Sequence, residues 1–149
     1  MLTHGNADIA LMLKNAKSTE KEAINMKYYP AFDMELKTKD IIRTLKMQHV
    51  REDRIACFNS KGTSTKNIIA RCHGLSKIQQ LGLKTEPFYT IEFITENFDK
   101  MPEDEKIKTI IHELMHIPNN FGGGFRHHDV VNRKSVEKMY KTYLEMKRQ

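Results

Sequence analysis

The sequence of 149 residues contains no tryptophan, only two cysteines and no long apolar run. Two cysteines, Cys57 and Cys72, are too few for a disulfide framework, and they suit a reducing compartment. The longest apolar run covers residues 9–13, whereas a membrane-spanning helix needs about 20 such residues. The first eight residues lack the basic start and apolar core of a secretory signal. These absences exclude a disulfide scaffold and a membrane-spanning protein, and they favour a cytoplasmic location with no membrane partner.

The residues that are present have the composition of a folded domain with a basic surplus. Hydrophobic residues make up 39% and charged residues 30%, which is a globular composition and not that of a disordered tail. The 25 Lys and Arg against 19 Asp and Glu give a formal charge of +6. No repeat, low-complexity tract or glycine/serine-rich linker divides the chain, so we expect one domain.

Apolar residues recur at helical spacing in four segments. These segments are residues 7–27, 38–48, 103–117 and 133–148. The helix over 103–117 is the best supported, because Pro102 suits a first helical turn and Pro118 ends the helix.

Two segments have the pattern of β-strands. Residues 54–58 form a short apolar run that we expect to be closed by a turn over 59–62. Residues 88–94 are rich in aromatic and β-branched side chains. Residues 66–83 are ambiguous between helix and strand. Helices flanking a small antiparallel or mixed sheet indicate the α+β class.

The sequence of residues 112–116 is HELMH, an H-E-x-x-H motif. Residues four apart on a helix differ by about 40° around the axis, so His112 and His116 point the same way. This spacing lets both imidazoles bind one zinc ion at about 2.0–2.1 Å. Glu113 can reach water on the metal without being a ligand, and its role in this motif is that of a general base.

The helix that carries the motif has an apolar stripe on its other side. The stripe residues recur at i, i+3, i+4 and i+7: Ile107, Ile110, Ile111 and Leu114. His112 and His116 lie roughly 140–180° from the centre of this stripe. The helix can therefore bury its aliphatic face and present both histidines to a cleft. The alternative is a pair of solvated helix histidines that bind no metal.

A catalytic zinc usually has three protein ligands and one open position, so a third ligand is needed after the helix. Three glycines at 122–124 permit backbone angles closed to other residues and let the chain double back towards the metal. The spacing H-E-x-x-H-x-x-G-x-x-H is absent, because position 122 is glycine. The residues alone leave three candidates for the third ligand: His127, His128 and Asp129.

The run from His112 to His128, HELMHIPNNFGGGFRHH, resembles the small metallopeptidases of archaea and phages, which are related to the SprT-like zincins. Their pattern is H-E-L-x-H-I-P, then a phenylalanine and glycines, then R-x-H. The similarity extends upstream through residues 70–75, 78–79 and 89–94. It covers roughly residues 50–130.

The resemblance implies a zincin-like metallopeptidase fold, with a short sheet, an active-site helix and zinc-dependent peptide hydrolysis. Within R-x-H the ligand position falls on His128, and His127 takes the variable position. We therefore expect N-terminal helices over 1–49, a catalytic core over 50–132 and a C-terminal helix over 133–149.

These inferences combine into a predicted site. Zn²⁺ is held by His112, His116 and His128, and Glu113 is the general base for hydrolysis of a protein or peptide substrate. The residues expected to contact the substrate or the oxyanion are Arg126, His127 and Tyr89. The strand over 88–94 is expected to bind an extended peptide at the sheet edge.

Two other function classes stay open. By analogy with SprT-like proteases, the protein would act on DNA-bound proteins. Residues 59–85, with five basic side chains and no acid, would then contact nucleic acid. A charge run is usually just a solvated face. The third class is a catalytically idle zinc-binding interaction protein. Nothing in the sequence sets the oligomeric state.

Overall fold

The computed structural model describes residues 26–149. Its elements in chain order are β1 (Lys27–Pro30), α2 (Phe32–Thr44), the 3-10 turn η1 (Glu52–Arg54), β2 (Ile55–Lys61), β3 (Ala70–Gly74), α3 (Lys77–Leu83), β4 (Tyr89–Ile94), α4 (Thr95–Phe98), α5 (Glu103–Met115) and α6 (Arg133–Lys147). The expected helix over 7–27 lies outside the described residues except at its end, where Lys27 belongs to β1.

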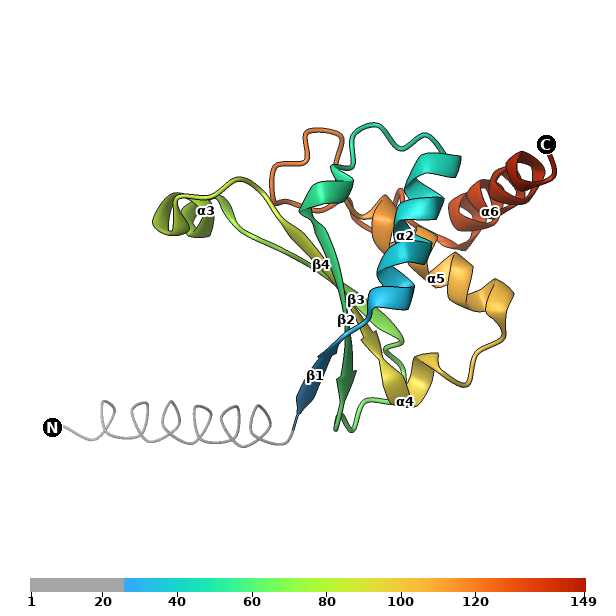
Figure 1. Cartoon of the computed structure of the whole chain (residues 1–149), viewed down its shortest axis with the longest axis horizontal. Coiled ribbons are helices and arrows are strands. Elements are labelled where there is room, and N and C mark those ends of the chain that lie inside the picture. Colours follow the sequence, from blue (N-terminus) through green and yellow to red (C-terminus); the bar gives the residue numbers. More distant parts are fainter. Residues whose placement is uncertain (1–25) are drawn as a thin grey trace, which may run out of the picture.

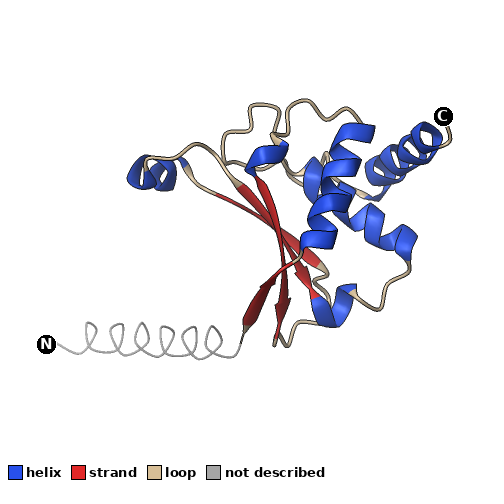
Figure 2. Ribbon diagram, viewed as in Figure 1, coloured by secondary structure: helices blue, strands red, loops and turns tan. Residues whose placement is uncertain are grey.

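The strands form a four-stranded mixed sheet in the order β1-β2-β4-β3. Strands β2 and β4 are parallel, whereas β1 pairs with β2 and β3 pairs with β4 in antiparallel fashion. Helices α2, α5 and α6 gather on one side of this sheet, and α3 projects away from the body (Figures 1 and 2). The predicted α+β class is confirmed, with a mixed sheet.

The hydrophobic core lies between the sheet and these helices. Alternate residues of β4 are fully buried there, as expected for a strand with one face towards the core: Tyr89, Ile91 and Phe93. The predicted stripe of α5 is buried against them: Ile107, Ile110, Ile111 and Leu114. The apolar face of α5 is therefore used in packing, which leaves its other face for the site.

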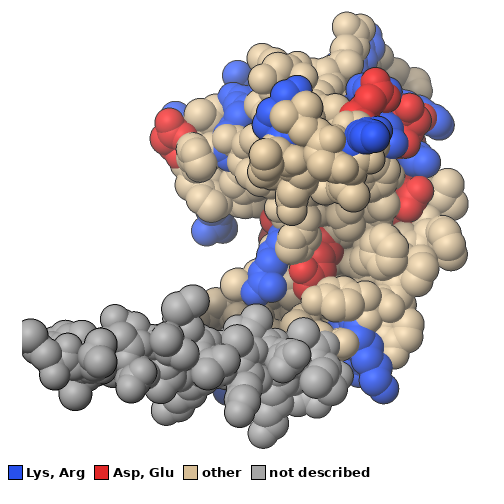
Figure 3. All heavy atoms as spheres, turned by 90° about the vertical axis from the view of Figure 1, so that its left-hand side faces the viewer, with Lys and Arg blue, Asp and Glu red and all other residues tan. Residues whose placement is uncertain are grey.

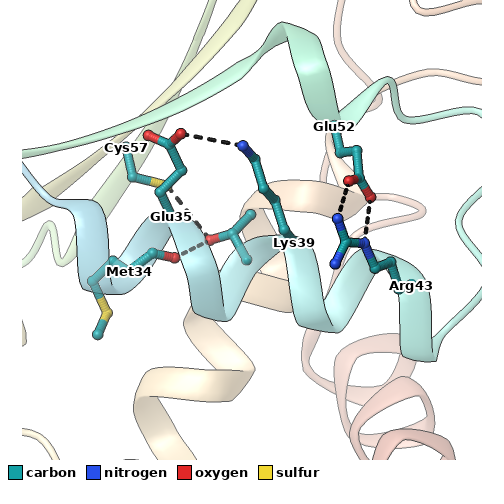
Figure 4. Close-up of polar contacts among 7 residues, drawn as sticks. Met34, Glu35, Lys39, Arg43, Glu52 and Cys57 are labelled. Carbon is teal, nitrogen blue, oxygen red and sulfur yellow. Dashed lines mark hydrogen bonds and ion pairs between the residues drawn. The ribbon is translucent and has the colours of Figure 1, made fainter.

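Helix α2 is joined to β2 and to η1 by polar contacts (Figure 4). The buried Thr38 hydroxyl donates to the Met34 carbonyl at 2.7 Å and lies 3.5 Å from the Cys57 thiol. Arg43 forms two hydrogen bonds with the Glu52 carboxylate. Burial raises the pKa of the Cys57 thiol to about 11, so this cysteine packs as a small neutral side chain.

Three predicted boundaries were wrong in the N-terminal half. Helix α2 begins at Phe32 and not at residue 38. Residues 59–61, expected to be a turn, continue strand β2. They do so because β1 pairs with them, which also makes residues 27–30 a strand in a region expected to contain only helices. A partner strand far away in sequence overrides the local turn preference.

The ambiguous segment 66–83 contains both kinds of element, β3 and then α3. Ser76 begins α3 with a capping box, in which its side chain accepts from the Gln79 backbone and the Gln79 side chain accepts from the Ser76 backbone. The short elements η1 and α4 were not predicted.

The position of β4 corrects one functional expectation. Residues 88–94 were expected to bind a peptide at a sheet edge, but β4 lies between β2 and β3 and has no free edge. The edge strand on that side is β3, which contacts α5. None of the helices between residues 26 and 149 combines the length and the apolar composition that a transmembrane helix needs.

Candidate active site

Helix α5 places the first two histidines of the motif on one face. His112 lies in its last turn and His116 is its C-terminal cap, with helical backbone angles. Their Nε2 atoms are 3.1 Å apart, and both side chains are half-buried. Two tetrahedral zinc ligands at about 2.05 Å have nitrogens about 3.3 Å apart, so the pair fits one ion.

The loop after α5 brings His128 to this pair. Ring nitrogens of His112, His116 and His128 all lie within 4.8 Å of one another, and this is the one such group of three or more candidate ligands among residues 26–149. His127 is not part of the group, although it lines the adjoining cavity. The structure therefore brings His128, and not His127, together with His112 and His116.

His116 contacts the backbone of Arg126 at two points. The Arg126 backbone N–H donates to the His116 carbonyl at 2.7 Å, and His116 Nδ1 lies 2.6 Å from the Arg126 carbonyl oxygen. A carbonyl can only accept, so we assign the ring proton to Nδ1, which leaves the Nε2 lone pair facing the other histidines. Metal-binding histidines are oriented in this way by a hydrogen bond from their second nitrogen.

Tyr89 holds the glycine segment of the same loop. Its hydroxyl accepts from the Gly123 N–H and donates to the Gly124 carbonyl, both at 2.8 Å. The side chain is fully buried and does not line the cavity. The expectation that Tyr89 contacts substrate or an oxyanion is corrected, because its hydroxyl is already bonded to the loop that carries His128.

Gln80 is a second anchor of this loop, and no sequence pattern indicated it. Its Nε2 donates to the Gly122 and Leu75 carbonyls at 2.8 Å each, and the residue is buried. Gly123 has φ of +103°, and a Cβ there would lie 2.0 Å from the Leu75 oxygen. Gln80 is the one buried side chain of an otherwise exposed short helix. Burial of this kind is seen only in the structure, so the sequence carried no signal for Gln80.

Glu113 lies beside the histidines and is buried, with 6% of its surface exposed. Burial raises the pKa of its carboxyl to about 7, although a hydrogen bond from the Cys72 backbone N–H opposes that rise. Burial and the neighbouring His116 and His128 lower the pKa of His112 to about 4, which keeps this ring neutral and able to bind a metal.

A cavity of about 910 Å³ opens over these groups. Its walls are the β3 segment, the face of α5 with the histidines, the loop over 125–128 and the start of α6. The predicted contact residues Arg126 and His127 line it, as do Arg71 and His73 of the edge strand. The cavity therefore lies between the edge strand and the histidines.

Three imidazoles with a neutral His112, an oriented His116 and no cysteine in the group form a donor set that suits Zn²⁺, and nitrogen ligands also suit other transition ions. The model of the family described as "Putative phage metallopeptidase" matches residues 26–148. The chain belongs to this family. No curated protein and no solved structure matches the chain.

The family match is wider than the resemblance over residues 50–130. It includes β1, α2 and α6. These elements are integral to the phage metallopeptidase domain, because Ile41, Ile42, Val136 and Tyr143 belong to the same core as α5.

Proposed function

We propose that this member of the phage metallopeptidase family hydrolyses peptide bonds with a zinc ion held by His112, His116 and His128. The observation that supports it best is the convergence of three imidazoles beside a buried carboxyl group in an open cavity. A zinc ion in this position supplies Lewis acidity, which lowers the pKa of a coordinated water and polarises a carbonyl group. The arrangement supports a zincin-like organisation of the site.

Glu113 is the general base in this proposal. A carboxyl group with a pKa of about 7 takes up and releases a proton near neutral pH, which suits a group that accepts the proton of the attacking water and passes it to the leaving amine. The backbone N–H of Cys72 favours the ionised form of this carboxylate. Arg126 and His127 are the lining residues that we assign to the oxyanion or the substrate.

We assign the substrate backbone to the edge of β3 that faces the cavity, opposite β4. Odd-numbered residues of this segment bond to β4, since the Ile94 N–H donates to the Ile69 carbonyl and the Leu75 N–H to the Phe88 carbonyl. Even-numbered residues face away from β4, as the Cys72 N–H does. An extended peptide can pair there as an added strand beside the histidines.

The replacement Glu113→Gln tests the base. It keeps the shape of the side chain and removes its ability to accept a proton, so we expect a loss of peptide hydrolysis of at least 100-fold with zinc content unchanged. The measurement is cleavage of a peptide library with and without chelator, beside metal analysis. Normal cleavage by the variant would show that another group is the base, and no cleavage by the metal-loaded wild type would favour an idle zinc-binding protein.

The third ligand is tested by comparing His128→Ala with His127→Ala. We expect the first to lose zinc and the second to keep it, because only His128 lies with the other two rings. Full zinc occupancy in His128→Ala together with loss in His127→Ala would reverse the assignment.

A further inference from the structure

Helix α3 forms a projecting arm. It lies at the far end of the β3–β4 ribbon, away from α2, α5 and α6 (Figure 1). Within α3 only Gln80 is buried, and this residue anchors the arm to the glycine loop through the Gly122 carbonyl. The arm is therefore fixed to the body at its base, and its outer surface is free of contacts with the body.

The outer surface of the arm is unusually apolar. Ile78 is 76% exposed, Leu81 63% and Leu83 64%. Ile78 and Leu81 are one helical turn apart, and Leu83 follows at the end of α3. We call these three residues the arm tip. At 100° per residue Leu83 lies about 160° around the axis from Leu81, so Ile78 and Leu81 share one side of α3 and Leu83 projects from another. Exposed aliphatic side chains are common singly, but three within six residues surround the end of this projecting helix with apolar groups.

Lysines flank the arm tip on both sides. Lys77 begins α3 and Lys84 is its left-handed C-terminal cap, and both are exposed. Neither forms an ion pair within residues 26–149. No acidic residue occurs from 59 to 85. Figure 3 looks onto this side of the molecule, where blue basic side chains lie on a mostly tan upper surface and red acidic side chains lie towards its edges.

We propose that the arm tip inserts into the interfacial region of an anionic lipid bilayer. Three aliphatic side chains between two free lysines match a surface whose acyl boundary takes up apolar groups and whose headgroups carry negative charge. The contact is peripheral and needs no membrane-spanning helix.

Two other occupants fit the arm less well. A stable protein interface buries about 800 Å² on each partner, which three side chains on a convex tip do not supply. A nucleic acid would pair with Lys77 and Lys84 through its phosphates but would leave the aliphatic side chains exposed to water. A bilayer contacts both the aliphatic side chains and the lysines.

The test is co-sedimentation of the full chain with sucrose-loaded vesicles of phosphatidylcholine alone or with 30% phosphatidylserine. We expect binding to the anionic vesicles, and we expect Ile78→Gln, Leu81→Gln and Leu83→Gln combined to reduce the bound fraction at least tenfold. The matched control is Phe32→Gln with Leu36→Gln, because these α2 side chains are each 72% exposed elsewhere on the molecule. The control should bind like the wild type.

Lysine variants test the charge contribution, and two further results would identify a protein or a nucleic acid as the occupant. Lys77→Gln with Lys84→Gln should lower binding to anionic vesicles to the level seen with neutral ones. Absence of binding by the wild type, or equal binding by the arm-tip variant, would overturn the proposal. A vesicle-independent shift of that variant from dimer to monomer would identify a protein interface instead, and binding lost only with the lysines and displaced by DNA would identify a polyanion site.

These measurements do not depend on the peptidase proposal. Cleavage of a small soluble peptide should be the same in the wild type and in the arm-tip variant, because the arm tip is not among the residues that line the cavity. Vesicle binding should also persist in chelator. Failure of the lipid contact and failure of the peptidase are therefore seen in separate assays.

Discussion

His116 shows how one residue joins the motif to the rest of the site. Its Nε2 faces His112, and its Nδ1 is bonded to the Arg126 carbonyl two residues before His128. The same backbone contact therefore orients the His116 ring and returns the chain so that His128 reaches the other two histidines. The motif predicted the pair on α5, but the Arg126 contact depends on the path of a loop that has no helical or strand periodicity.

Gly123→Ala tests this loop at the level of a single residue. Its Cβ would lie 2.0 Å from the Leu75 oxygen at a φ of +103°, so the loop must shift, and we expect zinc affinity to fall at least tenfold. Isothermal titration with zinc measures the effect. Gly124→Ala is the control, because no atom lies within 4 Å of a Cβ at that position. Equal affinities in the two variants would show that the loop adapts without cost.

Helices α2 and α6 are far apart in the sequence, and hydrogen bonds between their side chains join them in the fold. The Tyr143 hydroxyl donates to Asp40 at 3.0 Å, and Lys147 donates to the same carboxylate at 2.7 Å. The hydrogen bond from Lys147 is the main cause that holds the pKa of Asp40 below its usual range. The helical periodicity predicted α6 well, but it did not indicate which helix α6 packs against.

Asp40→Asn should lower the free energy of unfolding by about 1 kcal/mol at pH 7, a modest value because the side chain is 39% exposed. Folding lowers the pKa of Asp40. The contribution of this carboxylate to stability is therefore complete at pH values above its pKa in the unfolded chain, about 3.9, and is lost as the pH falls through its lower pKa in the folded protein. The difference between wild type and variant should therefore be constant from pH 6 to 8 and shrink below about pH 4. Urea unfolding of the metal-free proteins measures it, with Asp99→Asn as the control for an exposed acid that forms no ion pair within residues 26–149. A difference that grew on acidification would contradict the assignment.

In the molecule as a whole, the core and the metal site lie on opposite faces of α5. Ile110, Ile111 and Leu114 are fully buried against the sheet, whereas His112 and His116 face the cavity. We therefore expect the chain to fold without a metal ion. Binding still stabilises the fold, because a ligand that binds only the native state shifts the unfolding equilibrium.

Removal of metal with a chelator should leave the far-ultraviolet circular dichroism spectrum unchanged and lower the Tm. At a free zinc concentration of 100 Kd, binding adds about 2.7 kcal/mol to the free energy of unfolding. For a domain of this size, that stabilisation raises the Tm by roughly 5–10 °C. His128→Ala is the control, and its Tm should respond much less to zinc. Unfolding of the wild type in chelator would show that the metal is structural.

Features that depend on neighbours along the chain could be predicted from the residues alone. The period of α5 places its aliphatic stripe and the His112–His116 pair on different faces, and the aromatic and β-branched run predicted β4. Tertiary structure decided the features that depend on distant partners. Pairing with β1 extended β2, the strand order made β3 and not β4 the edge, and Gln80 and Tyr89 fixed the loop that brings His128 to the site. Local spacing sets which side of a helix a residue occupies, whereas pairing and loop closure are set by contacts that only the folded chain forms.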